Sequence, residues 1–240
     1  MPRTCCPVLE LRQYTLKPGE RDTLIGIFEQ HFVESQETLG MRIAGTFRDV
    51  SRPDRFVWLR GFEDMESRRV GLEAFYTGPV WKEHRTAANA TMIDSANVLL
   101  LRPAGEASGF ALPERRAGQA DAAPPARVIV ATLHSFAAPV EPGFPAWFAA
   151  EAVPLLAKAG APVVGQFVTE PAANTFPALP VREGENVFAW FAAYPDLASA
   201  SAPLDRVPGW RERVEPRLRP LAKGAPERIV LEPTRRSLLR

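Results

Sequence analysis

The side chains best suited to acid–base chemistry are His31, His84 and Tyr14, all in the first half of the chain. Imidazole changes its charge near neutral pH, so a positioned histidine can act as a general acid or base. Arg12, two residues before Tyr14, places a fixed charge fork beside a hydroxyl group. We therefore predict a site that holds an anionic or phenolic group, with His31, His84 and Tyr14 as candidate catalytic residues and Arg12 as a candidate substrate-binding residue.

Helical periodicity places both histidines on apolar faces. In a helix expected over 20–39, His31 and Ser35 fall inside an apolar stripe, and in a helix expected over 79–92 His84 lies in the middle of another. The first stripe consists of Leu24, Phe28, Phe32 and Leu39, and the second of Val80, Trp81, Ala88, Thr91 and Met92. Both histidines should then point into one layer, either to line a pocket with Ser35 or as core residues bonded to the backbone or to a tyrosine.

Alternation along a strand expected over 9–16 puts Glu10, Arg12, Tyr14 and Leu16 on one face. Arg12 then either binds a ligand or forms an ion pair with Glu10, since buried charges are normally paired. The pattern leaves open whether this face meets the helices or the opposite sheet. Only in the first case would Arg12 and Tyr14 share a cavity with the histidines.

Aromatic residues recur along the expected strands and helices. Trp58 and Trp81 are candidate substrate-binding residues that would favour a flat apolar ligand, although core packing explains such residues equally well. The same two readings apply to Phe56, Phe62 and Trp190.

The first half predicts the order strand, helix, strand, strand, helix, strand, which is the split βαβ arrangement. Further strands are expected over 41–50, 56–62 and 97–102, with a short helix beginning at Asp64. The second half repeats this pattern: Gly45-Thr46-Phe47 matches Gly165-Gln166-Phe167, and Trp58 matches Trp190. The offset grows between these two matches, where 171–185 reads as an extended loop rich in Pro, Gly and Asn.

These observations predict an α+β fold of two tandem ferredoxin-like units that bury their sheets face to face, with the helices outside. The expected domains are 7–103 and 126–235. A linker is expected over 104–125, whose Gly, Pro, small and charged residues predict little buried surface.

The residues Glu10 to Gly19, which read ELRQYTLKPG, resemble the opening motif of the NIPSNAP family. The segments 28–31, 45–47 and 81–84 fit the same family. The resemblance implies the dimeric α/β-barrel superfamily, which includes monooxygenases, haem-dependent enzymes, isomerases and cyclases. It suggests an enzyme of monooxygenase, cyclase or isomerase type acting on a small aromatic or polycyclic compound in the first half, or alternatively a non-catalytic small-molecule, haem-binding or oligomerisation module.

The second half departs from this pattern. Glu10, Arg12 and Tyr14 are replaced by Val130, Thr132 and His134 at the matching positions. We therefore expect one polar site, in the first half, with a second half that completes the barrel. Haem ligation by His31, His84 or His134 stays open, whereas no other cofactor and no metal site are predicted because the usual motifs are missing.

Composition narrows the expected partners. The net charge of +1 and the lack of a basic block give no support for nucleic-acid binding. The apolar runs are too short for a membrane helix, and the N-terminus lacks a secretory pattern, so we expect a cytoplasmic protein with a small-molecule ligand. The Ala, Pro and Arg content suggests a bacterial origin, and pairing of two such chains is possible.

Both ends of the chain are expected to be loosely held. The adjacent Cys5 and Cys6 should be two free thiols near a loose terminus. The mildly basic segment 234–240 should be a solvated tail.

Overall fold

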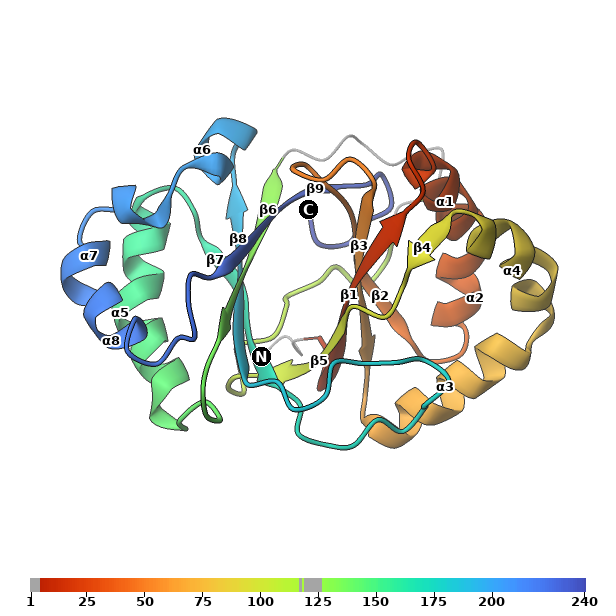
Figure 1. Cartoon of the computed structure of the whole chain (residues 1–240), viewed down its shortest axis with the longest axis horizontal. Helices are drawn as coiled ribbons and strands as arrows, with labels where there is room; N and C mark the ends of the chain where they lie inside the picture. Colours follow the sequence, from red (N-terminus) through yellow and green to blue (C-terminus); the bar gives the residue numbers. More distant parts are fainter. Residues whose placement is uncertain (1–4, 117, 119–126) are drawn as a thin grey trace.

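The computed structural model describes residues 5–116, 118 and 127–240 and has a mixed α/β fold around a closed barrel (Figure 1). Nine strands are present among these residues. In chain order they are β1 (Val8–Leu16), β2 (Arg42–Asp49), β3 (Arg55–Phe62), β4 (Met92–Asp94), β5 (Val98–Pro103), β6 (Val128–Ser135), β7 (Val163–Thr169), β8 (Val187–Tyr194) and β9 (Glu227–Pro233).

Eight of these strands close the barrel in the order β3-β2-β9-β6-β8-β7-β5-β1, and β1 returns to β3. Every pairing is antiparallel, and β4 extends β1 outside the ring. The strands of the two halves meet edge to edge, at β2–β9 and at β5–β7. The two sheets expected to stack face to face are therefore joined into one barrel with no free edge in the ring.

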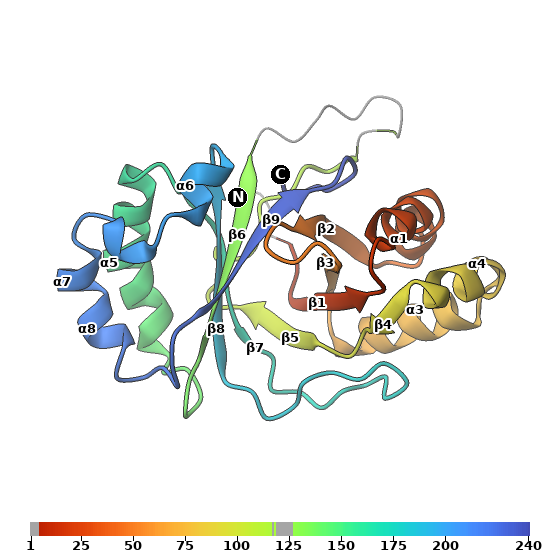
Figure 2. The same cartoon turned by 45° about the horizontal axis from the view of Figure 1, so that its top comes forward.

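Helices cover the barrel on two opposite sides, one set from each half of the chain (Figures 1 and 2). The first set contains α1 (Arg21–Ile27), the π-helical segment η1 (Phe28–Phe32), α2 (Val33–Glu37), α3 (Met65–Thr77) and α4 (Pro79–Ala90). The second contains α5 (Gly143–Lys158), α6 (Leu197–Ser201), the 3₁₀ segment η2 (Leu204–Arg206), α7 (Trp210–Arg213) and α8 (Glu215–Leu218).

Local sequence signals account for some element boundaries. Asp64 caps α3, its carboxylate accepting a hydrogen bond from the Ser67 amide at 2.6 Å. Gly40 follows α2 with a φ of +83°, a conformation that glycine adopts without strain. The helix expected over 20–39 contains a π-helical turn at Phe28–Phe32, and β4 was not predicted.

The barrel interior is apolar. Alternation along β1 turns Leu9 and Leu11 inward, where they join a cluster from both halves of the chain. Phe110 is fully buried in this cluster, with ring centroids 4.7 Å from Phe167 and 5.0 Å from Phe191. Gly109 and Phe110 are the buried residues among 104–116, and residues 117 and 119–125 lie outside the described residues, so the linker stays a prediction.

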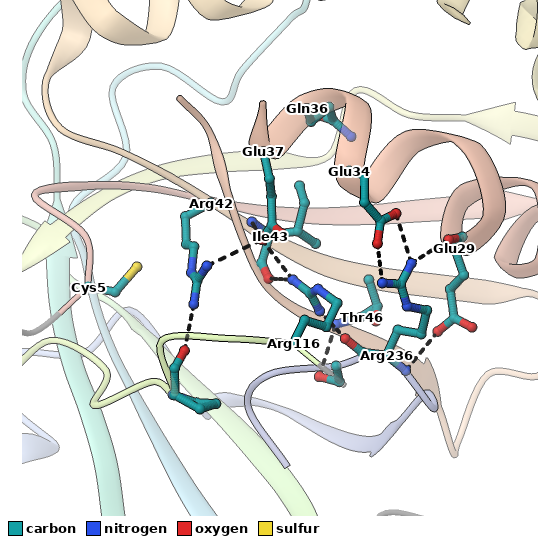
Figure 3. A network of polar contacts seen from close by, with 12 residues as sticks. Cys5, Glu29, Glu34, Gln36, Glu37, Arg42, Ile43, Thr46, Arg116 and Arg236 are labelled. Carbon is teal, nitrogen blue, oxygen red and sulfur yellow. Dashed lines mark hydrogen bonds and ion pairs between the residues drawn. The ribbon is translucent and has the colours of Figure 1, made fainter. Parts of the chain in front are cut away.

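The C-terminal segment is also packed, so the solvated tail predicted for 234–240 is wrong. Four consecutive residues, Arg236 to Leu239, are at most 6% exposed. The Arg236 guanidinium forms an ion pair with Glu34 and donates to the Glu29 carbonyl at 2.8 Å (Figure 3). Arg116 likewise pairs with Glu37 at 2.9 Å. Arg116 and Arg236 each lie in a segment that follows one half of the barrel. Their contacts bind both segments to the helix layer of the first half.

Replacing Arg236 with methionine should lower the free energy of unfolding by about 1–2 kcal/mol, because the charged hydrogen bonds to Glu34 and Glu29 are lost. Urea denaturation measures this difference. The exposed neighbour Arg235 is the matched control, and Arg235→Met should change stability by less than about 0.5 kcal/mol. Equal effects of the two substitutions would show that the Arg236 contacts do not hold in solution.

The sulfur atoms of the adjacent Cys5 and Cys6 lie against each other near the start of the described residues, and the two free thiols stay a prediction. Cys5 also pairs with Phe110 as an isolated β-bridge, which ties this end of the chain to the segment that fills the barrel.

Candidate functional site

Glu10, Arg12 and Tyr14 project from the outer face of β1 into the helix layer of the first half. Tyr14 belongs to the cluster formed with these helices, whereas Leu9 and Leu11 line the barrel. This answers the question that strand alternation left open. The Glu10–Arg12 ion pair expected as one alternative is present at 3.0 Å.

Two further arginines join Glu10. The carboxylate accepts hydrogen bonds from Arg60 at 2.7 Å and from Arg68 at 2.8 Å, and the side chains of all four residues are fully buried. Burial alone would raise the pKa of Glu10, but the positive charges of Arg60, Arg12 and Arg68 outweigh it and lower that pKa to about 2. Glu10 is thus an anion shared by three guanidinium groups.

Arg12 also brings two of the other predicted residues together. Its Nε donates to the Tyr14 hydroxyl at 3.0 Å, and its Cζ lies 5.4 Å from the Trp58 ring centroid. The Tyr14 and Trp58 rings meet edge to face at 5.8 Å. Burial raises the pKa of Tyr14, so the hydroxyl is neutral near pH 7.

The two histidines of the first half lie against each other. The His31 and His84 rings stack with centroids 3.7 Å apart, and both side chains are half-buried. The Ser35 hydroxyl donates to the His31 carbonyl at 2.7 Å. Trp81, also half-buried, packs against Phe32 with ring centroids 5.5 Å apart.

Four cavities stand out in the described part of the chain, and none of them is lined by the seven predicted residues. The largest, about 590 Å³, lies in the second half, beneath α7 and α8. Its walls include Trp210, Leu218 and His134. A cavity of this size falls within the range of ordinary ligand pockets.

His134 reaches this cavity from β6 and is 1% exposed. Its Nε2 accepts a hydrogen bond from the Trp190 indole N–H at 3.2 Å. A neutral imidazole has one protonated nitrogen, so this bond places the proton on Nδ1. Nδ1 is buried and has no hydrogen-bond partner in the described part of the chain. His134 therefore carries a buried N–H donor without a partner in the described part of the chain, and its side chain forms part of the wall of this cavity.

Burial lowers the pKa of His134 to about 4, because no nearby charge offsets the loss of hydration. The unfolded chain takes up a proton at its ordinary pKa of 6.5, whereas the folded protein does not. The contribution of neutral His134 to stability is thus complete above pH 6.5 and is lost as the pH falls toward 4.

We expect the wild type to lose roughly 3 kcal/mol more stability than His134→Gln between pH 7.5 and pH 4. Urea denaturation at several pH values measures this difference. The comparison removes the titration of every other group that the two proteins share. Parallel stability profiles would mean that the His134 ring is hydrated in the folded protein.

Sequence reasoning missed Arg60 and Arg68, and it named His134 only as a possible haem ligand. Arg60 lies opposite Glu10 in the β1–β3 register, and an arginine inside an apolar strand was a usable signal. Arg68 lies far from β1 in the sequence, and only the fold brings its side chain to Glu10. His134 occupies the repeat position of Tyr14, so the match itself pointed to it.

Among the described residues, no group of three or more His, Cys, Asp or Glu side chains is placed to hold a metal ion. No described helix combines the length and apolar character needed to cross a membrane.

The closed antiparallel ring with helices on both outer sides is the architecture of the dimeric α/β barrels, formed here within one chain. The sequence model of the NIPSNAP family matches residues 9–107, so the first half of this chain is a NIPSNAP domain. No curated protein matches the chain by sequence.

Several solved structures share the fold over nearly the whole chain. A candidate monooxygenase from Fusobacterium nucleatum has a TM-score of 0.55 at 11% identity and covers 95% of this chain and 93% of its own. One from Lactobacillus acidophilus has a TM-score of 0.54 at 11% identity and covers 95% and 94%. An anthrone oxidase-like protein has a TM-score of 0.54 at 14% identity and covers 98% and 94%. At these identities the likeness establishes the fold.

Proposed function

We propose that the protein is an oxygenase-type enzyme that binds an aromatic or polycyclic molecule with a carbonyl or phenolic oxygen in the cavity beside His134. The observation that carries this proposal is the unpartnered Nδ1–H of a buried, neutral imidazole at the wall of a cavity of about 590 Å³. A buried donor without a partner is costly, and a ligand oxygen would satisfy it.

The cavity walls favour a flat apolar body. Trp210 and Leu218 are buried beside the cavity, and Leu204 lines it as well. Charged side chains lie at its more exposed parts, among them Glu215 and Lys223. An aromatic ring system would replace water against the apolar residues while its oxygen accepts the His134 hydrogen bond.

The same donor can assist a reaction. When an aromatic ketone such as anthrone loses a proton from the CH2 group of its central ring to solvent, negative charge collects on its oxygen. The His134 N–H would stabilise that charge where water is excluded, which favours the electron-rich enolate over the ketone. Enolates of this kind react with molecular oxygen, and the names of the structural neighbours, monooxygenase and anthrone oxidase-like, support this reaction class.

Anthrone, a tricyclic ketone, is the probe for this proposal. Equilibrium dialysis should give saturable binding, and His134→Phe should weaken it at least tenfold because the donor is lost while ring volume is kept. An oxygen electrode should record anthrone-dependent oxygen uptake by the wild type and little by this variant. Unchanged binding by His134→Phe would contradict the proposal.

Matched tryptophan variants test the location. Trp210→Phe changes the cavity wall, whereas Trp147→Phe changes α5 where Trp147 packs on Arg217. Only the first should reduce binding. Loss of binding in His31→Phe or His84→Phe, with His134→Phe unaffected, would place the site in the first half, as the sequence predicted. Tight binding without oxygen uptake would favour the non-catalytic binding module.

We also propose that the two halves are diverged copies of one ferredoxin-like unit. In this proposal β1, β2, β3 and β5 correspond in order to β6, β7, β8 and β9. Strand β2 then corresponds to β7, and β9 corresponds to β5, so the β2–β9 pairing corresponds to the β7–β5 pairing. The two junctions of the barrel are thus equivalent, as a twofold arrangement of two copies requires. On this basis the His134 cavity and the Arg12–Tyr14 layer occupy corresponding places, under the helices of each copy.

A further inference from the structure

The layer around Glu10 carries more positive than negative charge. Three guanidinium groups, those of Arg12, Arg60 and Arg68, share the single carboxylate of Glu10, and all are fully buried. The other groups that bond to these arginines are neutral: the Tyr14 hydroxyl, the Gln36 carbonyl at 2.7 Å, and residues of one loop. A buried excess of cations is unfavourable unless an anion compensates it.

Three buried side-chain nitrogens in this layer make no hydrogen bond in the described part of the chain: Nη2 of Arg12, Nε1 of Trp58 and Nη2 of Arg68. Nη2 of Arg68 still lies 2.8 Å from the Glu10 carboxylate, so the donors without any acceptor are those of Arg12 and Trp58. Arg12 and Trp58 are directly opposite each other in the β1–β3 register. The unused donors therefore come from neighbouring side chains on the same face of the sheet, beside the excess charge.

The loop between β7 and β8 covers this layer, although it belongs to the other half of the chain. It extends from the barrel along α3 (Figures 1 and 2). Asn174 accepts a hydrogen bond from Arg68 at 2.9 Å, and Thr175 donates to the Met65 carbonyl at 2.9 Å. Phe176 stacks on Tyr76 with ring centroids 5.9 Å apart. The extended loop thus closes the arginine layer from outside.

We propose that this layer binds one small monovalent anion, a halide or formate, between Nη2 of Arg12 and Nε1 of Trp58. The anion reduces the excess positive charge and accepts both unused hydrogen bonds. The closed surroundings select for size, because none of the four cavities in the described part of the chain lies beside these donors to admit an aromatic acid. This site is distinct from the His134 cavity, so neither proposal depends on the other.

Bromide is a suitable probe because it quenches the fluorescence of a neighbouring indole. Titration of the full-length protein at constant ionic strength should give a saturable quenching component, in addition to the linear collisional quenching of exposed tryptophans. Trp58→Phe should abolish the saturable component. Trp147→Phe, which changes a tryptophan on α5, should keep it.

Competition and stability measurements define the ligand. Formate should displace bromide, and benzoate at the same concentration should not. Chloride at constant ionic strength should raise the melting temperature saturably in the wild type and not in Trp58→Phe, since a ligand that binds the folded state stabilises it. Arg12→Lys keeps the charge but has one nitrogen in place of the three of the guanidinium, so it has no counterpart of Nη2. This substitution should weaken bromide binding about tenfold.

Purely linear quenching, or a saturable component that survives in Trp58→Phe, would overturn the proposal. Displacement of bromide by benzoate as readily as by formate would also overturn it, because the layer would then be open to larger carboxylates.

Discussion

Glu10→Gln should destabilise the protein by about 3–5 kcal/mol, because it removes the one carboxylate that neutralises three buried arginines. Glutamine keeps the size and shape of the side chain, so the loss reports charge rather than packing. Urea denaturation near pH 7 measures it. Glu63→Gln, at an exposed glutamate of the same half, should change stability by less than about 0.5 kcal/mol.

The pH dependence of this stability loss shows whether the charge of Glu10 causes it. The pKa of Glu10 is lowered to about 2 in the folded protein, against an ordinary value of 4.5. Its contribution is therefore fully present above pH 4.5 and is lost as the pH falls through 2. The stability difference between wild type and Glu10→Gln should shrink over this range. A difference that stays constant down to pH 2 would contradict the ion-pair account.

Phe110→Ala should cost about 3–5 kcal/mol, although Phe110 lies in a stretch whose composition resembles a linker. The substitution leaves a cavity inside the barrel where the ring packs on Phe167 and Phe191. Urea or thermal denaturation measures the loss. The matched surface control is Ile93→Ala, since Ile93 is 64% exposed. A cost near that of the control would mean that this segment leaves the barrel in solution.

The element order and the side-chain alternation of β1 were predictable because strand periodicity is a local property. The face that Glu10, Arg12 and Tyr14 occupy was not predictable, because both faces of β1 are buried. Burial therefore does not distinguish the barrel interior from the helix layer along β1. Only the closure of the barrel through the second half decides between the two faces.

The contacts of Phe110 and of the β7–β8 loop escaped prediction for a different reason. Their sequences are rich in residues typical of loops, and their order comes from distant partners: Phe167 and Phe191 for Phe110, and Arg68 for Asn174. Composition reports local tendencies and not tertiary contacts. The sequence already showed that the second half departs from the family pattern at His134. We interpreted this departure as the loss of a polar site, whereas it is also consistent with a different site.

The central claim is that His134 offers a buried Nδ1–H to a ligand, and nitrogen-15 NMR of the imidazole rings tests it directly. The chain has three histidines, so the His134 signals can be assigned by substitution. We predict a neutral ring protonated on Nδ1 from pH 8 down to pH 5, with nitrogen signals that shift when anthrone is added. A ring that titrates near pH 6.5, or signals that anthrone leaves unchanged, would contradict the account.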